Sequence, residues 1–266
     1  MSQIFKAEQL TLRRNVAIKV ILKEQDLEAS QQFLLEASLT ANLDHPNIVK
    51  VHDFGRTHAG TLFLVMELIN GQTLKEWVSD RGPMTPEDAI QLTRQICGAL
   101  SEAHEKGVVH RDIKPSNILL TRRAGAGLTA KLIDFGLVEA QHYTGEQSKP
   151  KRILGTPMYM APEQIEMKSV DDRVDIYSLG LTMFYALTGR TPYMRINIQE
   201  LMRAQLKDPL PRLNSTNPNF AENHPLQWVI DTATSKRPSD RFQNTLQMLR
   251  SLEVCQTHSN SADTPS

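Results

Sequence analysis

Only two cysteines, Cys97 and Cys255, occur among the 266 residues of this chain. Two cysteines cannot build the bridge framework of small secreted proteins, so the composition favours a reducing compartment, the cytoplasm. An excess charge is also missing, because 30 basic residues balance 30 acidic ones. This balance removes any general electrostatic argument for binding nucleic acid or an anionic membrane.

Long apolar runs are absent as well. The densest stretch, LFLVMELI at 62–69, is broken by Glu67 and is far shorter than the roughly 18 residues that suggest a membrane span. The first ten residues, MSQIFKAEQL, show no apolar segment of the signal-peptide kind. We therefore expect a globular protein without a membrane segment.

One stretch, VVHRDIKPSNILLTRRAGAGLTAKLIDFG at 108–136, carries most of the residues with evident chemistry. It predicts two short strands joined by a polar turn, with Asn117 just before the first strand and Asp134 just after the second. Such a hairpin brings an amide and a carboxylate together, and oxygen ligands of this kind suit Mg²⁺. Asp112 precedes Asn117 by five residues and would face a substrate hydroxyl beside the metal.

The pattern HRDIKPSN followed by DFG resembles the catalytic and metal-binding loops of protein kinases. Either tripeptide alone is weak evidence, but the eight-residue pattern with DFG at a suitable distance is specific. The resemblance runs from about residue 4 to about residue 252 and is closest to bacterial eukaryotic-like (Hanks-type) serine/threonine kinases. It implies ATP and Mg²⁺ as cofactors. The residues that it assigns to chemistry are Asp112 and Lys114 for catalysis and Asn117 and Asp134 for the metal.

The motif VAIK ends in Lys19, inside an apolar strand predicted over residues 15–22. Taken alone, this lysine is best explained as a side chain pointing to solvent, since a buried charge needs a partner. The resemblance instead makes it the lysine that contacts phosphate and pairs with Glu36, because HPNIV follows Glu36 at the expected spacing of nine residues. Without the resemblance, Glu36 would be an ordinary solvated helix residue.

A helix is predicted over residues 27–43, with Leu35, Leu39 and Leu43 forming one apolar stripe at a spacing of four. Thr40 departs from the family pattern, which usually has an apolar residue at this position. A hydroxyl there would loosen the active arrangement.

The resemblance also assigns a set of residues to the nucleotide. These are Lys19, Glu36, Ile4, Ala17, Met66, Glu67, Ile69 and Leu119. Met66 matches the gatekeeper, and the backbone of Glu67 and Ile69 would bind adenine. Ala17 and Leu119 would close on the two faces of the base, although plain core packing would explain both equally well.

Glycine is missing where such a kinase needs it, since none occurs before Gly55. Close approach of backbone to phosphate usually requires glycine. MSQIFKA at 1–7 aligns with only the second half of the family's glycine-rich loop. We expect a small lobe without its first strand and a raised KM for ATP, either because the chain starts here or because the start is an internal methionine. A pseudokinase or weak ATP-binding scaffold is the alternative function.

In the second half of the chain, Thr85 should begin a helix as its N-cap, and the apolar run at 175–187 predicts a fully buried helix. By resemblance, Asp175 anchors the backbone of the HRD loop, and Arg241 pairs with Glu163.

The segment GTPMYMAPE at 155–163 resembles a docking element for protein substrates, which disfavours a small-molecule phosphotransferase. Lys114 and Thr156 are typical of the serine/threonine type. Expected partners are protein substrates with Ser or Thr hydroxyls and a second copy of the chain for autophosphorylation, on Ser148 or Thr144.

The predicted fold class is therefore α+β, a bilobal protein-kinase fold with a small β-rich lobe and a larger helical lobe. We expect a kinase domain over 1–253, divided into 1–69 (small lobe and hinge) and 70–253 (large lobe). The polar residues 254–266 are predicted to be a disordered tail.

Overall fold

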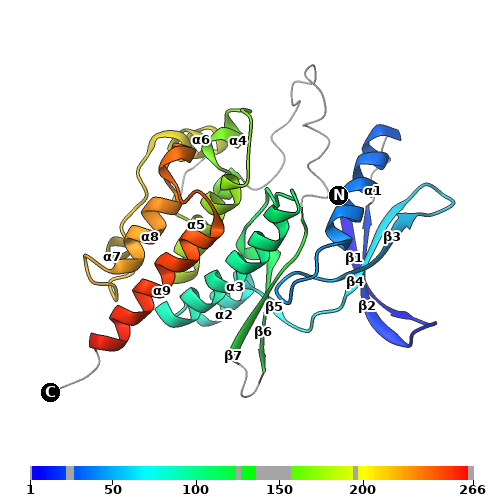
Figure 1. Ribbon diagram of the computed structural model, residues 1–266, viewed down its shortest axis with the longest axis horizontal. Coiled ribbons are helices and arrows are strands. Elements are labelled where there is room, and N and C mark those ends of the chain that lie inside the picture. The colour runs from blue at the N-terminus through cyan, green and yellow to red at the C-terminus, as the bar shows by residue number, and fades with distance from the viewer. Residues whose placement is uncertain (1, 22–26, 124–126, 136–156, 194–196, 263–266) are drawn as a thin grey trace.

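The computed structural model describes residues 2–21, 27–123, 127–135, 157–193 and 197–262. A small lobe dominated by strands and a larger lobe dominated by helices lie side by side along the long axis of the molecule (Figure 1). The predicted bilobal α+β architecture is confirmed.

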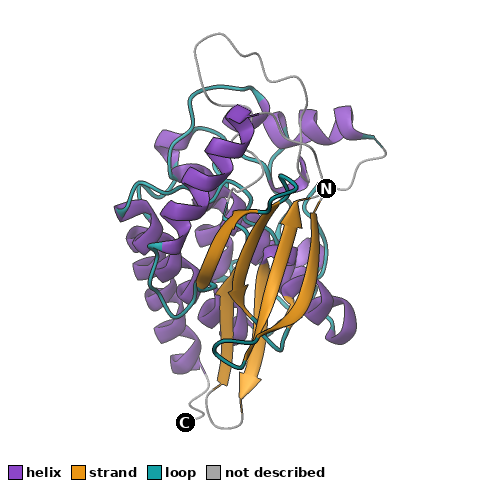
Figure 2. Ribbon diagram, turned by 90° about the vertical axis from the view of Figure 1, so that its right-hand side faces the viewer, coloured by secondary structure: helices purple, strands orange, loops and turns teal. Residues whose placement is uncertain are grey.

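The small lobe is a four-stranded antiparallel sheet in the order β1-β2-β4-β3, accompanied by one helix. Figure 2 shows its strands running side by side. Its elements are β1 (Ser2–Gln9), β2 (Arg14–Ile21), α1 (Leu27–Ala41), β3 (Val51–Arg56) and β4 (Leu62–Glu67). Because β1 forms an edge of this sheet, Ile4 and Phe5 remain 58% and 48% exposed.

Helix α1 turns a different face to the sheet from the one predicted. Leu35 and Leu39 are 56% and 42% exposed, so the expected leucine stripe is wrong over the helix. Instead, Phe33, Ala37 and Thr40 are buried. These residues also recur at helical spacing, and the aromatic ring together with small neighbours allows close approach to the strands.

The large lobe contains a second, three-stranded sheet and most of the helices. The strands are β5 (Gln72–Thr73), β6 (Ile118–Arg123) and β7 (Gly127–Leu132), in the order β5-β6-β7. The α-helices are α2 (Leu74–Arg81), α3 (Pro86–Glu105), α4 (Pro162–Ile165), α5 (Arg173–Thr188), α6 (Ile198–Lys207), α7 (Leu213–Thr216), α8 (Pro225–Ala233) and α9 (Thr245–Ala262). Short 3₁₀ turns are η1 (Pro115–Asn117), η3 (Pro157–Tyr159) and η4 (Pro238–Asp240).

Local signals fix the predicted start of α3 and the end of α5. The Thr85 hydroxyl accepts a hydrogen bond from the Asp88 backbone N–H and caps α3, which has Pro86 in its first turn. Gly189 ends α5 in the left-handed region at φ 70°, where a residue without a side chain is least strained.

Helix α5 forms the centre of the large lobe, and every residue in it except Arg173 and Tyr185 is buried. A Cβ at Gly180 would come within 2.8 Å of Thr234 and 2.9 Å of Ala233, so glycine permits the close approach of α8. The prediction of a helix that is buried on all sides is confirmed.

The expected disorder of residues 254–266 is corrected by α9, which continues to Ala262. Met248, Leu252 and Cys255 form a buried stripe of this helix, which packs against α3. Burial of this stripe holds the polar sequence in helical form at least to Cys255, and the backbone remains helical beyond it. Within the described part of the chain, no helix combines the length and apolar character that a membrane crossing would need.

Candidate active site

A buried carboxylate anchors the backbone of the HRD loop. Asp175 is completely buried and accepts hydrogen bonds from the backbone N–H groups of His110 (2.8 Å) and Arg111 (2.7 Å). His104 Nε2 lies 2.8 Å from the same carboxylate. Arg111 has a φ of 64°, which is uncommon for a residue with a side chain, and the two bonds to Asp175 hold this conformation. The predicted anchoring role of Asp175 is confirmed.

The next residues of this loop contact one another through their side chains. They are Asp112, Lys114 and Asn117. Lys114 Nζ lies 2.5 Å from Asp112 Oδ2. The Asn117 amide nitrogen donates to the Asp112 backbone carbonyl at 2.8 Å and to the same Oδ2 at 2.9 Å. Both amide hydrogens are used in these bonds, so the amide oxygen is the polar atom that Asn117 still has to offer.

Asp134 reaches the same place from the other arm of the hairpin. The Ile133 backbone N–H donates to the Asn117 carbonyl at 3.0 Å, which sets the two loops side by side. Lys19 Nζ lies 2.8 Å from Asp134 Oδ1, so the predicted strand lysine is buried and paired with a charge from the large lobe. Apart from this ion pair, Oδ1 has no hydrogen-bond partner among the described residues.

This donor set suits a hard divalent cation. The Asp134 carboxylate has unused acceptor capacity, and the Asn117 amide oxygen belongs to the adjoining loop. Mg²⁺ prefers few protein oxygen ligands and completes its shell with water and phosphate. The side chains that the sequence proposed for the metal therefore fit it chemically.

The residues assigned to the nucleotide come from both lobes. Ala17 in β2 lies opposite Met66 in β4, and both pack in the small-lobe core together with Ile69. Ile4 lies opposite Lys19 in the β1–β2 register. Leu119 lies in β6 of the large lobe.

Two groups of predicted residues lie beyond what the structure describes. Helix α1 contains Glu36, but the side chain of that residue is outside the described part of the chain. The candidate phosphorylation sites Thr144 and Ser148, together with Thr156, fall in the segment 136–156, which is likewise outside it.

Sequence reasoning missed a side-chain role for Glu67. It was assigned to adenine through its backbone alone, yet its carboxylate lies 2.6 Å from Lys131 Nζ on β7 and accepts from the Lys50 backbone N–H at 2.8 Å. Its own N–H donates to the Lys50 carbonyl at 2.9 Å. Glu67 thus connects the end of the small-lobe sheet to the large-lobe hairpin. No local sequence pattern predicts this contact.

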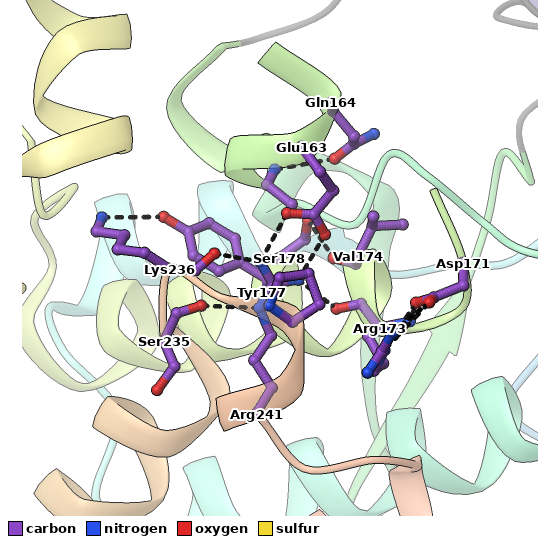
Figure 3. A network of polar contacts seen from close by, with 12 residues as sticks. Glu163, Gln164, Asp171, Arg173, Val174, Tyr177, Ser178, Ser235, Lys236 and Arg241 are labelled. Carbon is purple, nitrogen blue, oxygen red and sulfur yellow. Dashed lines mark hydrogen bonds and ion pairs between the residues drawn. The ribbon is translucent and has the colours of Figure 1, made fainter. Parts of the chain in front are cut away.

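A buried ion pair links α4 to the segment that precedes α9. Arg241 Nη1 and Nη2 donate to the two carboxylate oxygens of Glu163 at 2.6 and 2.7 Å, as Figure 3 shows. Arg241 also donates to the backbone carbonyls of Ser235, Arg173 and Lys236. The two side chains are almost inaccessible to solvent, and the bidentate geometry satisfies both charges. The predicted pairing is confirmed.

Comparison with known proteins agrees with this geometry. Residues 1–253 match the model of the protein kinase domain. The chain belongs to the protein kinase family. This kinase domain is 36% identical over 257 residues to serine/threonine-protein kinase PknB of Mycobacterium tuberculosis, covering 93% of the chain and 40% of that protein. It is 34% identical over 245 residues to serine/threonine-protein kinase PrkC of Bacillus subtilis, covering 91% and 37%.

Among solved structures, the kinase domain resembles Rad53 residues 1–466 in complex with AMP-PNP, with a TM-score of 0.75 at 26% identity. The likeness covers 93% of this chain and 60% of that one. The chain spans only about 40% of the length of the curated relatives described here.

Proposed function

We propose that this kinase domain transfers the γ-phosphoryl group of ATP to serine and threonine hydroxyls of proteins. The observation that carries the proposal is the convergence of Asp112, Lys114 and Asn117 beside Asp134. A pseudokinase would be favoured by the loss of Lys19, Asp112 or Asp134, and all three are present. The names of the relatives and the nucleotide analogue in the Rad53 complex support the same reading.

In the proposed reaction, the substrate hydroxyl oxygen attacks the γ-phosphorus in line while the bond to the β,γ-bridging oxygen breaks. Asp112 orients the hydroxyl and accepts its proton. Lys114, which lies against Asp112, would steady the transferred phosphoryl group. Mg²⁺, when held by Asp134 and Asn117, would neutralise charge on the phosphates. Lys19, which lies beside Asp134, would bind the remaining phosphates.

A radiolabelled ATP assay with a generic protein substrate such as casein tests this function. Wild type should transfer label, and Asp112→Asn should reduce transfer at least about a hundredfold, because proton acceptance and hydroxyl orientation are lost. Asp80→Asn is the matched control, since Asp80 is exposed and its carboxylate accepts a hydrogen bond from Gln72, a residue without an assigned catalytic role. Equal transfer by wild type and Asp112→Asn would refute the assignment.

Autophosphorylation would follow from the same activity. Arg111 lies beside the catalytic aspartate, and an arginine there can pair with a phosphate on the segment that follows DFG. The predicted acceptors are Ser148 or Thr144. Mass spectrometry after incubation with ATP decides this: phosphate found only outside residues 137–156 would contradict the prediction.

A further inference from the structure

The loop expected to dock protein substrates is held by a buried glutamine from another helix. Gln205 lies in α6 and is completely buried. Its side-chain nitrogen donates to the backbone carbonyls of Met160 at 2.7 Å and Pro157 at 3.2 Å. The two hydrogen bonds therefore hold the first and the last residue of the segment 157–160, which consists of the turn η3 and Met160.

If position 205 served packing alone, a glutamine there would cost folding free energy that an apolar residue would not. The Gln205 side-chain oxygen is buried without a hydrogen-bond partner among the described residues. Burying half of an amide unsatisfied costs folding free energy, and a leucine of similar size would fill the space without that cost. The two hydrogen bonds to the loop carbonyls therefore explain why a glutamine occupies this position.

Lys236 fixes Gln205 in turn. Its Nζ donates to the Gln205 backbone carbonyl at 2.6 Å and to the Tyr193 hydroxyl at 2.8 Å. That carbonyl belongs to the last turn of α6, where backbone oxygens lack partners within the helix. A cation at this end also complements the helix dipole. Figure 3 places Lys236 beside Tyr177 in the network that contains Glu163 and Arg241.

The surroundings of Lys236 make its charge sensitive to pH. Burial lowers the pKa of Lys236 to about 8, with Asp208 raising it and Arg241 lowering it. The charged and titratable groups that face it are Tyr177, Tyr193, Asp208 and Arg241, with Glu163 behind Arg241.

We propose that Gln205 and Lys236 form a brace that positions residues 157–160 and thereby sets the affinity for the protein substrate without acting on ATP. Both are positioning residues, since they act through the loop. This inference rests on the proposed function and on the resemblance of GTPMYMAPE at 155–163 to a docking element for protein substrates.

The test compares Gln205→Leu with Gln227→Leu. Gln227 is also a buried glutamine of the large lobe, but it bonds the Leu213 backbone N–H and Asp231 rather than the docking loop. With casein as substrate, Gln205→Leu should raise the KM for casein about tenfold and leave the KM for ATP unchanged, the size expected when one or two positioning hydrogen bonds are lost. Gln227→Leu should change neither constant more than about twofold.

Two further measurements complete the design. Hydrogen exchange should speed up severalfold in the segment 157–165 of Gln205→Leu but not in that of Gln227→Leu, and this readout needs no catalysis. Lys236→Met should raise the casein KM about threefold and remove a rise in this constant that wild type shows between pH 7 and 9. The brace is refuted if exchange in 157–165 is unchanged, or if both glutamine variants behave alike. A wild type without any transfer would refute the proposed function instead, and the exchange data would still decide the brace.

Discussion

The large lobe buries many charged and amide side chains, whereas Lys19 is the one buried charge among the described residues of the small lobe. In the large lobe, Asp175, Glu163, Arg241 and Gln205 are bonded within that lobe. The partner of Lys19 is Asp134, which the large lobe supplies. The loop that carries Asp112 and the segment around Glu163 are therefore preorganised by one lobe, while the position of Lys19 beside Asp134 depends on a contact between the two.

Glu67 and Lys131 make a second contact of this kind at the lobe junction. The Glu67–Lys131 pair is partly exposed, and ion pairs of this kind stabilise proteins only modestly. By contrast, removing one partner of a fully buried pair leaves an unpaired charge in the protein interior and is strongly destabilising. The same type of substitution should thus affect activity at the junction and stability inside the large lobe.

The largest expected effect comes from the junction. Asp134→Asn removes the carboxylate that should hold Mg²⁺ and that pairs with Lys19. Loss of one electrostatic stabiliser costs about 10²–10³ in rate, and a metal ligand should cost at least as much. We expect phosphoryl transfer to fall by at least that factor while the protein remains folded, as measured by a transfer assay and circular dichroism. Asp171→Asn, which alters an exposed pair with Arg173, is the control. Near-full activity of Asp134→Asn would show that the metal assignment is wrong.

Inside the large lobe the expected effect is on stability. Glu163→Ala leaves the Arg241 guanidinium buried without its carboxylate, although three backbone carbonyls still accept from it. We expect a loss of about 3–5 kcal/mol in the free energy of unfolding, measured by urea denaturation. Replacing an exposed partner of a surface pair, as in Lys168→Ala, should cost less than about 1 kcal/mol. Similar losses of unfolding free energy in the two variants would mean that the buried Glu163–Arg241 pair does not stabilise the large lobe more than a surface pair does.

The two faces of α1 provide a further test in the small lobe. Phe33 is 3% exposed and packs in the small-lobe core, whereas Leu39 is 42% exposed. Phe33→Ala should cost about 3 kcal/mol of unfolding free energy, and Leu39→Ala should change it by about 0.5 kcal/mol or less. Denaturant unfolding of both variants checks the assignment. A larger loss for Leu39→Ala would restore the leucine stripe that the sequence suggested.

Helix α1 shows what could not be predicted from the sequence, namely which face of the helix packs on the sheet. The spacing of Leu35 and Leu39 is helical, but so is that of Phe33 and Ala37, and periodicity alone does not say which face meets the sheet. The catalytic loops were predictable because HRD, DFG and their spacing form a long local pattern. Asp175 and Arg241 could be placed through the same resemblance.

Single polar residues outside the family motifs could not be predicted. Gln205 and the Glu67 carboxylate belong to no motif, and their roles depend on which carbonyls or cations the fold brings to them. The helical course of residues 254–262 was missed for a similar reason. Their composition is polar, and the burial of Cys255 that extends α9 is a tertiary effect.

The smallest expected effect concerns the pH dependence of stability in the large lobe. Burial lowers the pKa of Lys236 from an ordinary 10.5 to about 8 in the folded protein. Between these two values the unfolded chain retains the proton and the folded chain does not, so this lysine makes the free energy of unfolding rise with pH in that window. Below pH 8 both states are charged, and the cost of burying the charge is fully present.

Lys236→Met removes this titration, so the stability of wild type relative to the variant should increase steadily from pH 8 to pH 10. Urea denaturation of both proteins at pH 7, 8, 9 and 10 measures it, because groups common to the two proteins cancel in the difference. Lys207→Met is the control: Lys207 is exposed at the end of α6, and its difference from wild type should stay flat over the same range. A flat difference for Lys236→Met as well, or one that falls with pH, would mean that the amine is solvated in the folded protein and that its hydrogen bonds to Gln205 and Tyr193 do not persist.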